Sequence, residues 1–146
     1  MYLNKSFTVL TIFIMAIIFT GCGARGAYFN KFEQPTDGNA SIYVYRPAMF
    51  FRGGMRYNVI ISDDDNDITE GLMSNGAYIY TQVPANREIE IKTDTTSVGS
   101  ILIDTENQKT YCIKSYPVEG FISRAKIMQV DMETCKKEII NTQLHE

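Results

Sequence analysis

From residue 40 onward, apolar and polar residues alternate with a period of two, and turn-forming residues interrupt the alternation at intervals of about 8–12 residues. A period of two places successive side chains on opposite faces of a strand, so each run predicts a β-strand. In residues 87–92, for example, Ile89 and Ile91 alternate with charged residues. The predicted strands are residues 41–46, 56–61, 68–73, 77–83, 87–92, 97–104, 109–116 and 125–131.

These strands predict an all-β domain over residues 40–146, folded as an antiparallel β-sandwich of about 7–8 short strands. The strands end at turn signals such as Pro47, the acidic turn 63–67 and the Asn75-Gly76 pair. Residues 132–140 fit either a short C-terminal helix or one more strand. Nine tyrosines and no tryptophan also favour strands over helices.

The first 21 residues follow a different pattern. Lys5 is their only charged residue, and Phe7 to Phe19 is an apolar run that only Thr8 and Thr11 interrupt. A positive start, a short apolar core and small residues before a cut predict a secretory signal peptide over residues 1–21. The alternative is an uncleaved membrane anchor, but this run is shorter than the roughly 17–25 apolar residues that span a bilayer.

The segment from Phe19 to Cys22 resembles the lipobox of bacterial lipoproteins, although Phe19 stands where Leu is usual. The resemblance implies that Cys22 is the lipidated first residue of the mature protein, attached to a membrane by its acyl chains. Gly23 follows in place of an inner-membrane retention Asp, which favours the outer membrane. We therefore expect a lipid-anchored protein of the cell envelope that faces the periplasm.

Residues 22–39 contain few apolar side chains and several glycines and polar residues. Such a segment buries too little surface to offset its ordering entropy, so we expect a flexible tether between the lipid and the domain. The Tyr28-Phe29 pair leaves two alternatives open, because it could dock on the domain or lie at the lipid interface.

Several segments resemble an uncharacterised bacterial lipoprotein domain family, the domain of unknown function DUF2846. The most specific is the run 40–47, which reads Ala-Ser-Ile-Tyr-Val-Tyr-Arg-Pro, and the others are residues 50–54, residues 75–78, the turn after Val83-Pro84, and Gly120-Phe121. The order of these strands and turns is also similar to small sandwich modules of the PEGA type. The resemblance covers roughly residues 38–140 and implies a β-sandwich on a lipid anchor, with no established catalytic residue to transfer.

The charge of the chain argues against a nucleic-acid partner. Loss of residues 1–21 removes Lys5 and no acidic residue, so 13 basic residues face 17 acidic ones, a net charge of −4. No basic run is present, and an exported protein does not meet nucleic acid.

No set of residues in the sequence marks a catalytic centre, and we predict neither a catalytic residue nor a cofactor. His145 is the only histidine, and a frayed C-terminal tail would not hold it as a general base. Asp63, Asp65 and Asp67 have the spacing of a calcium loop, but Ile68 and Ser74 break the rest of that motif, so we expect a solvated turn and no metal site.

Two further pairs of residues leave alternatives open. Cys112 and Cys135 form either a disulfide or two separate buried thiols, and in a 109–116/125–131 hairpin Cys112 would lie opposite about Gln129. Tyr43 with Tyr45, and Tyr78 with Tyr80, each lie on one face of a strand. Such tyrosines either fill a wall of the sandwich or bind a glycan or peptide by stacking.

The loop around Phe50, Phe51 and Arg52 places consecutive apolar residues beside glycines, and the segment with Phe121 and Arg124 has the same character. These side chains either cap the end of the sandwich or form a contact patch with basic edges. We expect a non-enzymatic interaction or accessory module that binds another envelope protein or peptidoglycan. The alternative is an envelope hydrolase that uses paired carboxylates.

Overall fold

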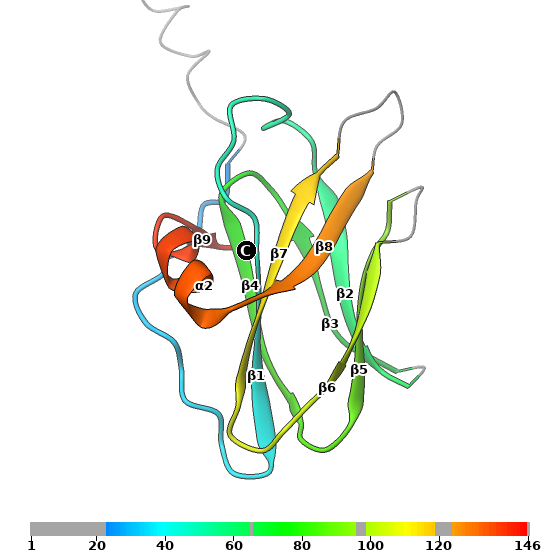
Figure 1. The fold of residues 1–146 in the computed structure, drawn as a ribbon. Helices are drawn as coiled ribbons and strands as arrows, with labels where there is room; N and C mark the ends of the chain where they lie inside the picture. The colour runs from blue at the N-terminus through cyan, green and yellow to red at the C-terminus, as the bar shows by residue number, and fades with distance from the viewer. Residues whose placement is uncertain (1–22, 65, 96–98, 119–123, 146) are drawn as a thin grey trace, which may run out of the picture.

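The computed structural model describes residues 23–64, 66–95, 99–118 and 124–145, and all structural statements below concern these residues. Two β-sheets pack face to face, which confirms the predicted sandwich (Figure 1). The elements are β1 (Asn39–Tyr45), β2 (Tyr57–Asp63), β3 (Asn66–Met73), β4 (Ala77–Pro84), β5 (Glu88–Thr93), β6 (Ser100–Asp104), β7 (Thr110–Pro117), β8 (Ala125–Val130), α2 (Met132–Ile139) and β9 (Gln143–Leu144). None of the described helices is long and apolar enough to cross a membrane.

The first sheet is mixed rather than purely antiparallel. Its strand order is β8-β7-β1-β4-β9, and β1 pairs with β7 in parallel, as β4 does with β9. Strands β1 to β7 alternate in direction along the chain, so β1 and β7 run the same way when they become neighbours. The second sheet has the order β3-β2-β5-β6 and is antiparallel throughout.

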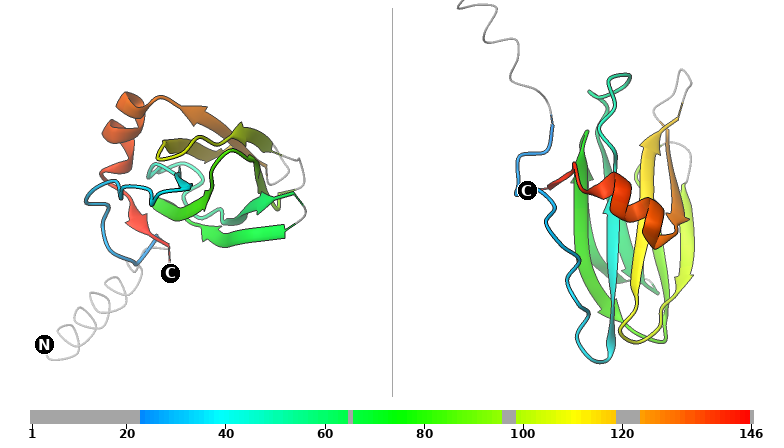
Figure 2. Two further views of the ribbon diagram at one scale, coloured as in Figure 1. Left: turned by 90° about the horizontal axis from the view of Figure 1, so that it is seen from below. Right: turned by 60° about the vertical axis from the view of Figure 1, so that its left-hand side comes forward.

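Strand β1 is buried on both of its faces. Ala40, Ile42 and Val44 point into the apolar core between the sheets. Tyr43 and Tyr45 point the other way, into a second cluster on the outer face of the five-stranded sheet. Two segments cover that outer face, the N-terminal segment 23–38 and helix α2 (Figure 2).

The N-terminal segment 23–38 is docked along the sheet, unlike the flexible tether that composition predicts. The Gly26 backbone N–H donates to Leu144 at 3.1 Å, and the Phe29 N–H donates to Thr142 at 2.9 Å. Phe29 and Phe32 pack edge-on against Tyr43, with ring centroids 6.0 and 5.0 Å away. Backbone hydrogen bonds, the two phenylalanines and contacts such as that of Thr36 with Gln82 therefore hold the segment in place.

Of the two predicted alternatives for residues 132–140, the structure contains the helix. Asp131 caps α2 by accepting a hydrogen bond from the Thr134 backbone at 2.8 Å, and Cys135 and Ile139 face the sheet. The helix reverses the chain after β8 and brings Cys135 back to Cys112, with which it forms a disulfide at a Cα–Cα distance of 6.1 Å. In the β7–β8 pair, Cys112 lies opposite Val130, one residue from the expected position at about Gln129.

Candidate functional site

The loop between β1 and β2 exposes two adjacent phenylalanines to solvent. Phe50 is 107% exposed and Phe51 is 64% exposed, so of the two alternatives that the sequence left open, these two side chains do not cap the sandwich. That end of the core is closed instead by residues that flank the loop, among them the buried Tyr57 and the partly buried Met55.

A buried arginine holds this loop from below. Arg46 is completely buried, its Nη1 donates to the Met55 carbonyl at 2.5 Å, and its Nη2 donates to the Arg52 carbonyl at 2.8 Å. Its guanidinium also lies 5.6 Å from the centre of the Tyr57 ring. Burial lowers the pKa of Arg46, and the electrostatic effect of the neighbouring Tyr57 only partly opposes that shift. The planar fork of arginine fits two carbonyls of one loop in a way that lysine would not.

Asn75 fixes the same loop from the β3–β4 turn. Its side chain accepts from the Met49 backbone N–H at 2.8 Å and donates to the Met49 carbonyl at 3.0 Å. A side chain at Gly53 would clash, since its Cβ would lie 2.8 Å from the Met49 carbonyl oxygen and 2.9 Å from Asn75. The loop thus presents Phe50 and Phe51 on a backbone of fixed shape. In the sequence, only the Gly53-Gly54 pair hints at this construction.

Val118 and Arg124, which flank the second of the two predicted loops, lie at the same end of the sandwich as the β1–β2 loop. Arg52 Nη1 donates to the Val118 carbonyl at 2.6 Å, which ties the β1–β2 loop to the base of the β7–β8 connection. Arg52 also lies 5.7 Å from the centre of the Phe51 ring. Arg124 is exposed on the far side of that connection. Phe121 lies outside the described residues, as do Cys22 and the signal peptide.

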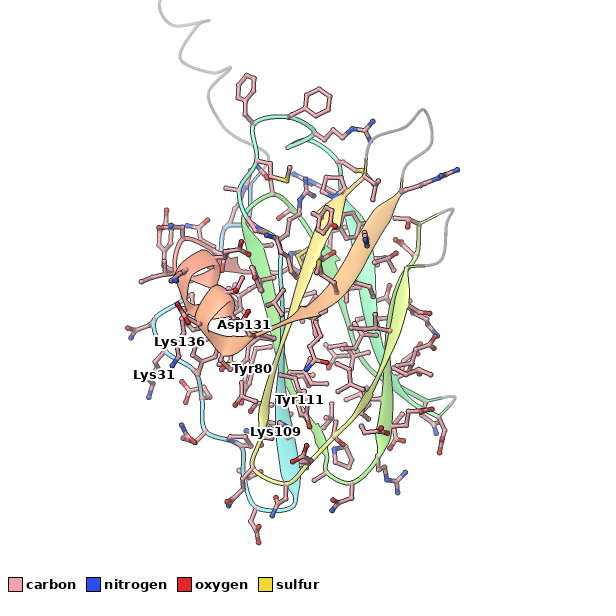
Figure 3. The ribbon with its side chains drawn as sticks, in the orientation of Figure 1. Lys31, Tyr80, Lys109, Tyr111, Asp131 and Lys136 are labelled. Carbon is pink, nitrogen blue, oxygen red and sulfur yellow. A yellow bond between two sulfur atoms is a disulfide. The ribbon has the colours of Figure 1, made fainter. Side chains whose placement is uncertain are left out.

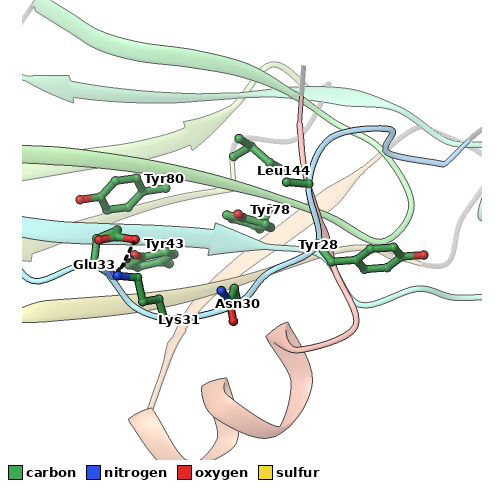
Figure 4. Close-up of a pocket in the computed structure, with 9 residues that line it drawn as sticks. Tyr28, Asn30, Lys31, Glu33, Tyr43, Tyr78, Tyr80 and Leu144 are labelled. Atoms are coloured by element: carbon green, nitrogen blue, oxygen red, sulfur yellow. Dashed lines mark hydrogen bonds and ion pairs between the residues drawn. The ribbon is translucent and has the colours of Figure 1, made fainter.

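A second candidate surface is a hollow in the outer face of the five-stranded sheet, which we call the tyrosine hollow. Tyr43, Tyr78 and Tyr80 form its floor, and the Tyr43 and Tyr80 rings stack with centroids 4.7 Å apart. The hollow measures about 310 Å³, and its other lining residues are Ala27, Tyr28, Asn30, Lys31, Glu33 and Leu144. Figure 4 shows Tyr80 next to Tyr43 and Tyr78 to one side of them, with Tyr28 turned away from the three rings. Tyr80 and Lys31 lie on the side of the molecule that carries α2 (Figure 3).

Two of the tyrosine hydroxyls in the hollow accept hydrogen bonds from polar neighbours. The Tyr43 hydroxyl accepts from the Glu33 backbone N–H at 2.7 Å, and the Tyr80 hydroxyl accepts from Gln82 Nε2 at 2.9 Å. Burial raises the pKa of Tyr43 to about 12, so its ring stays neutral at physiological pH. Lys31 and Glu33 form an exposed ion pair at 3.8 Å on the rim. The hollow is therefore a neutral aromatic floor with a polar edge, a composition suited to binding.

The carboxylates of Glu138 and Asp63 are paired with basic or hydroxyl side chains and are not arranged as a catalytic pair. Burial raises the pKa of Glu138, but hydrogen bonds from Lys114 and Tyr45 outweigh it, and the net pKa is lowered. Glu138 accepts from Lys114 at 2.7 Å and from Tyr45 at 2.6 Å, so it is an anion at neutral pH and no general acid. Asp63 pairs with Arg87 at 3.0 Å. In the described part of the chain, no group of three His, Cys, Asp or Glu residues could hold a metal ion.

The C-terminal tail that carries His145 is not frayed, contrary to the prediction from the sequence. The His145 backbone N–H donates to the Tyr78 carbonyl at 2.9 Å, beyond the short strand β9, so the tail is held on the sheet. His145 lines a cavity of about 340 Å³ together with Ser74, Arg25 and Arg56. Gly23, where the described chain begins, lies at the same cavity, which places a cluster of basic side chains beside it.

No protein-family model matches this chain, and no curated protein matches it either. The resemblance to the lipoprotein domain family and to PEGA-type modules therefore stays an expectation from the sequence.

Proposed function

We propose that this chain is a lipid-anchored protein of the cell envelope that acts as a non-enzymatic binding module, and that its tyrosine hollow takes a glycan of the cell wall. The observation that carries the proposal is the cluster of the partly exposed Tyr78 and Tyr80 rings beside the buried Tyr43. The lipid anchor at Cys22 and the position in the envelope rest on the sequence alone.

The chemistry of the hollow favours a sugar over a charged or purely apolar ligand. Sugars present an apolar face of C–H groups, which stacks on aromatic rings, and hydroxyls at their edges, which need polar partners. Tyr78 and Tyr80 offer the rings, and Asn30, Lys31 and Glu33 offer the polar edge. Tyrosine gives such contact at a low cost in side-chain entropy. Peptidoglycan is the extended glycan that a periplasm-facing domain meets.

The binding part is tested by sedimentation with purified, insoluble peptidoglycan. The Tyr80→Ala change removes one ring of the cluster, and we expect the sedimented fraction to fall severalfold. Tyr116→Ala is the matched control, because Tyr116 is also half-buried and belongs to β7 of the same sheet, outside the hollow. Thermal melting of both variants verifies their folding. Equal sedimentation of Tyr80→Ala and wild type would refute the glycan assignment.

The anchoring part is tested separately. We expect Cys22→Ser, or treatment with globomycin, to block maturation and to move the protein from the membrane fraction to the soluble fraction. An unchanged mass and unchanged partitioning would contradict the lipid anchor. The peptidoglycan sedimentation test would not be affected by that result.

A further inference from the structure

The exposure of Phe50 and Phe51 needs an explanation, because the loop that carries them is built to keep them out of the core. Arg46 and Asn75 hold the loop by four hydrogen bonds, and Gly53 allows its close contact with Met49. A loop so fixed cannot fold its phenylalanines over the neighbouring apolar residues. Two adjacent exposed aromatic residues on a fixed backbone indicate a contact surface.

The described chain begins at the same end of the sandwich. Gly23 forms a β-bridge with Asn75, and the Ala24 backbone N–H donates to the Asn75 carbonyl at 3.4 Å. Asn75 is also the residue that holds Met49, so one residue joins the start of the described chain to the phenylalanine loop. Figure 1 shows the β1–β2 loop and the beginning of the described chain at this end. Cys22, the proposed site of the lipid anchor, directly precedes Gly23 in the sequence.

Charge is also segregated between the two ends of the strands. The end with the phenylalanine loop carries Arg25, Arg52, Arg56 and Arg124, with Asp94 as an acidic neighbour. Arg25, Arg56 and His145 line the cavity beside Gly23. The opposite end carries Asp37, Asp63, Asp64, Asp67, Glu88, Asp104 and Glu106, with Arg87 and Lys109. A chain with a net charge of −3 thus turns arginines toward one end, where anionic headgroups would complement them.

We propose that the Phe50–Phe51 loop docks into the interfacial region of a lipid bilayer, with the surrounding arginines on anionic headgroups. This inference rests on the proposed lipid anchor, to which it adds a second point of attachment. Two points fix the orientation of the domain, with the strands standing away from the membrane and the acidic end farthest from it. The tyrosine hollow then lies on the side of the domain, open to a glycan strand that runs along the membrane.

The absence of tryptophan from the chain makes a direct test available. The full chain with Phe50→Trp, purified with its anchor, is reconstituted into vesicles of phosphatidylcholine and phosphatidylglycerol, with or without brominated acyl chains. Leu102→Trp is the matched control, because Leu102 is 63% exposed but lies on β6 of the other sheet. We expect emission from the Phe50→Trp protein to shift to shorter wavelength and to be quenched severalfold more strongly than that of the control.

The outcomes separate the two proposals. Suppose that both proteins sediment with the vesicles but that Phe50→Trp is quenched no more strongly than Leu102→Trp. This result would overturn the docking of the loop and would leave the lipid anchor supported. Equal quenching in vesicles of phosphatidylcholine alone overturns the role of the arginines. If mass spectrometry finds Cys22 unmodified, the anchor fails. The emission of the same protein on titration with anionic vesicles then decides the loop, since a blue shift upholds docking and an unchanged spectrum overturns it.

Discussion

At the scale of the residue, Arg46 is the least expendable side chain of the β1–β2 loop. It is fully buried. Among the described residues, its charged guanidinium contacts two carbonyl oxygens and a tyrosine ring rather than a carboxylate. Its removal would leave the Met55 and Arg52 carbonyls without their donor. An unsatisfied buried polar group costs about 1–3 kcal/mol.

We therefore expect Arg46→Met to lower the free energy of unfolding by about 2–4 kcal/mol, measured by urea denaturation. Arg87→Met is the control, because Arg87 is more than half exposed and pairs with Asp63 at the surface, where an ion pair contributes about 1 kcal/mol or less. Amide hydrogen exchange in residues 49–55 should also become faster in Arg46→Met. Equal losses in the two variants would mean that Arg46 does not hold the loop.

At the scale of the element, helix α2 is fastened to the outer face of the five-stranded sheet in three ways. The disulfide joins it to β7, Glu138 contacts Tyr45 of β1 and Lys114 of β7, and Ile139 packs in the outer cluster. Only the disulfide is covalent, and it also limits the freedom of the unfolded chain.

Reduction of this disulfide should lower the free energy of unfolding by about 3 kcal/mol, because the bond closes a loop between two cysteines that are 23 residues apart in sequence. The measurement compares denaturant midpoints with and without reductant in the Cys22→Ser chain, where Cys112 and Cys135 are the only cysteines. The Cys112→Ser/Cys135→Ser double variant is the control, and its midpoint should not respond to reductant. Equal midpoints of the oxidised and reduced chains would contradict the prediction.

At the scale of the whole molecule, the buried tyrosines make stability depend on alkaline pH. Burial raises the pKa of Tyr43 to about 12 and also raises the pKa values of Tyr45 and Tyr57, all from an ordinary value of 10.0. The folded protein therefore holds these protons more tightly than the unfolded chain does. Stability is at its full value below pH 10 and falls as the pH rises toward 12.

The test is the free energy of unfolding in urea between pH 8 and pH 12. We expect a monotonic fall above about pH 10 and a shallower fall in Tyr45→Phe, which removes one of the shifted groups. Tyr116→Phe serves as the control, because Tyr116 lies outside the hollow and the outer cluster. A constant free energy of unfolding across this range would contradict the prediction.

Local pattern predicts the fold well, because the alternation of residues such as Ile89 and Ile91 reports directly on one buried face. It could not predict that β1 is covered on both faces. Tyr43 and Tyr45 alternate correctly with Ile42 and Val44, but their cover comes from segments distant in sequence. The same limit explains the docked N-terminal segment and the exposed phenylalanines, since composition does not reveal the backbone bonds or the buried arginine that position them.

The pairing of the two ends of the domain has a consequence for the order in which it forms. Gly26 and Phe29 bond to Leu144 and Thr142, and β1 needs β7 as its parallel neighbour. Contacts between residues so far apart in sequence slow folding, because the chain loses the entropy of closing a long loop before these stabilising contacts form. During synthesis, β1 lacks its neighbour β7, and its outer face lacks the cover of α2, until most of the chain has emerged. We therefore expect the domain to complete its folding only when most of the chain is available. A chain truncated before residue 142 would lose the backbone hydrogen bonds that hold Gly26 and Phe29 on the sheet.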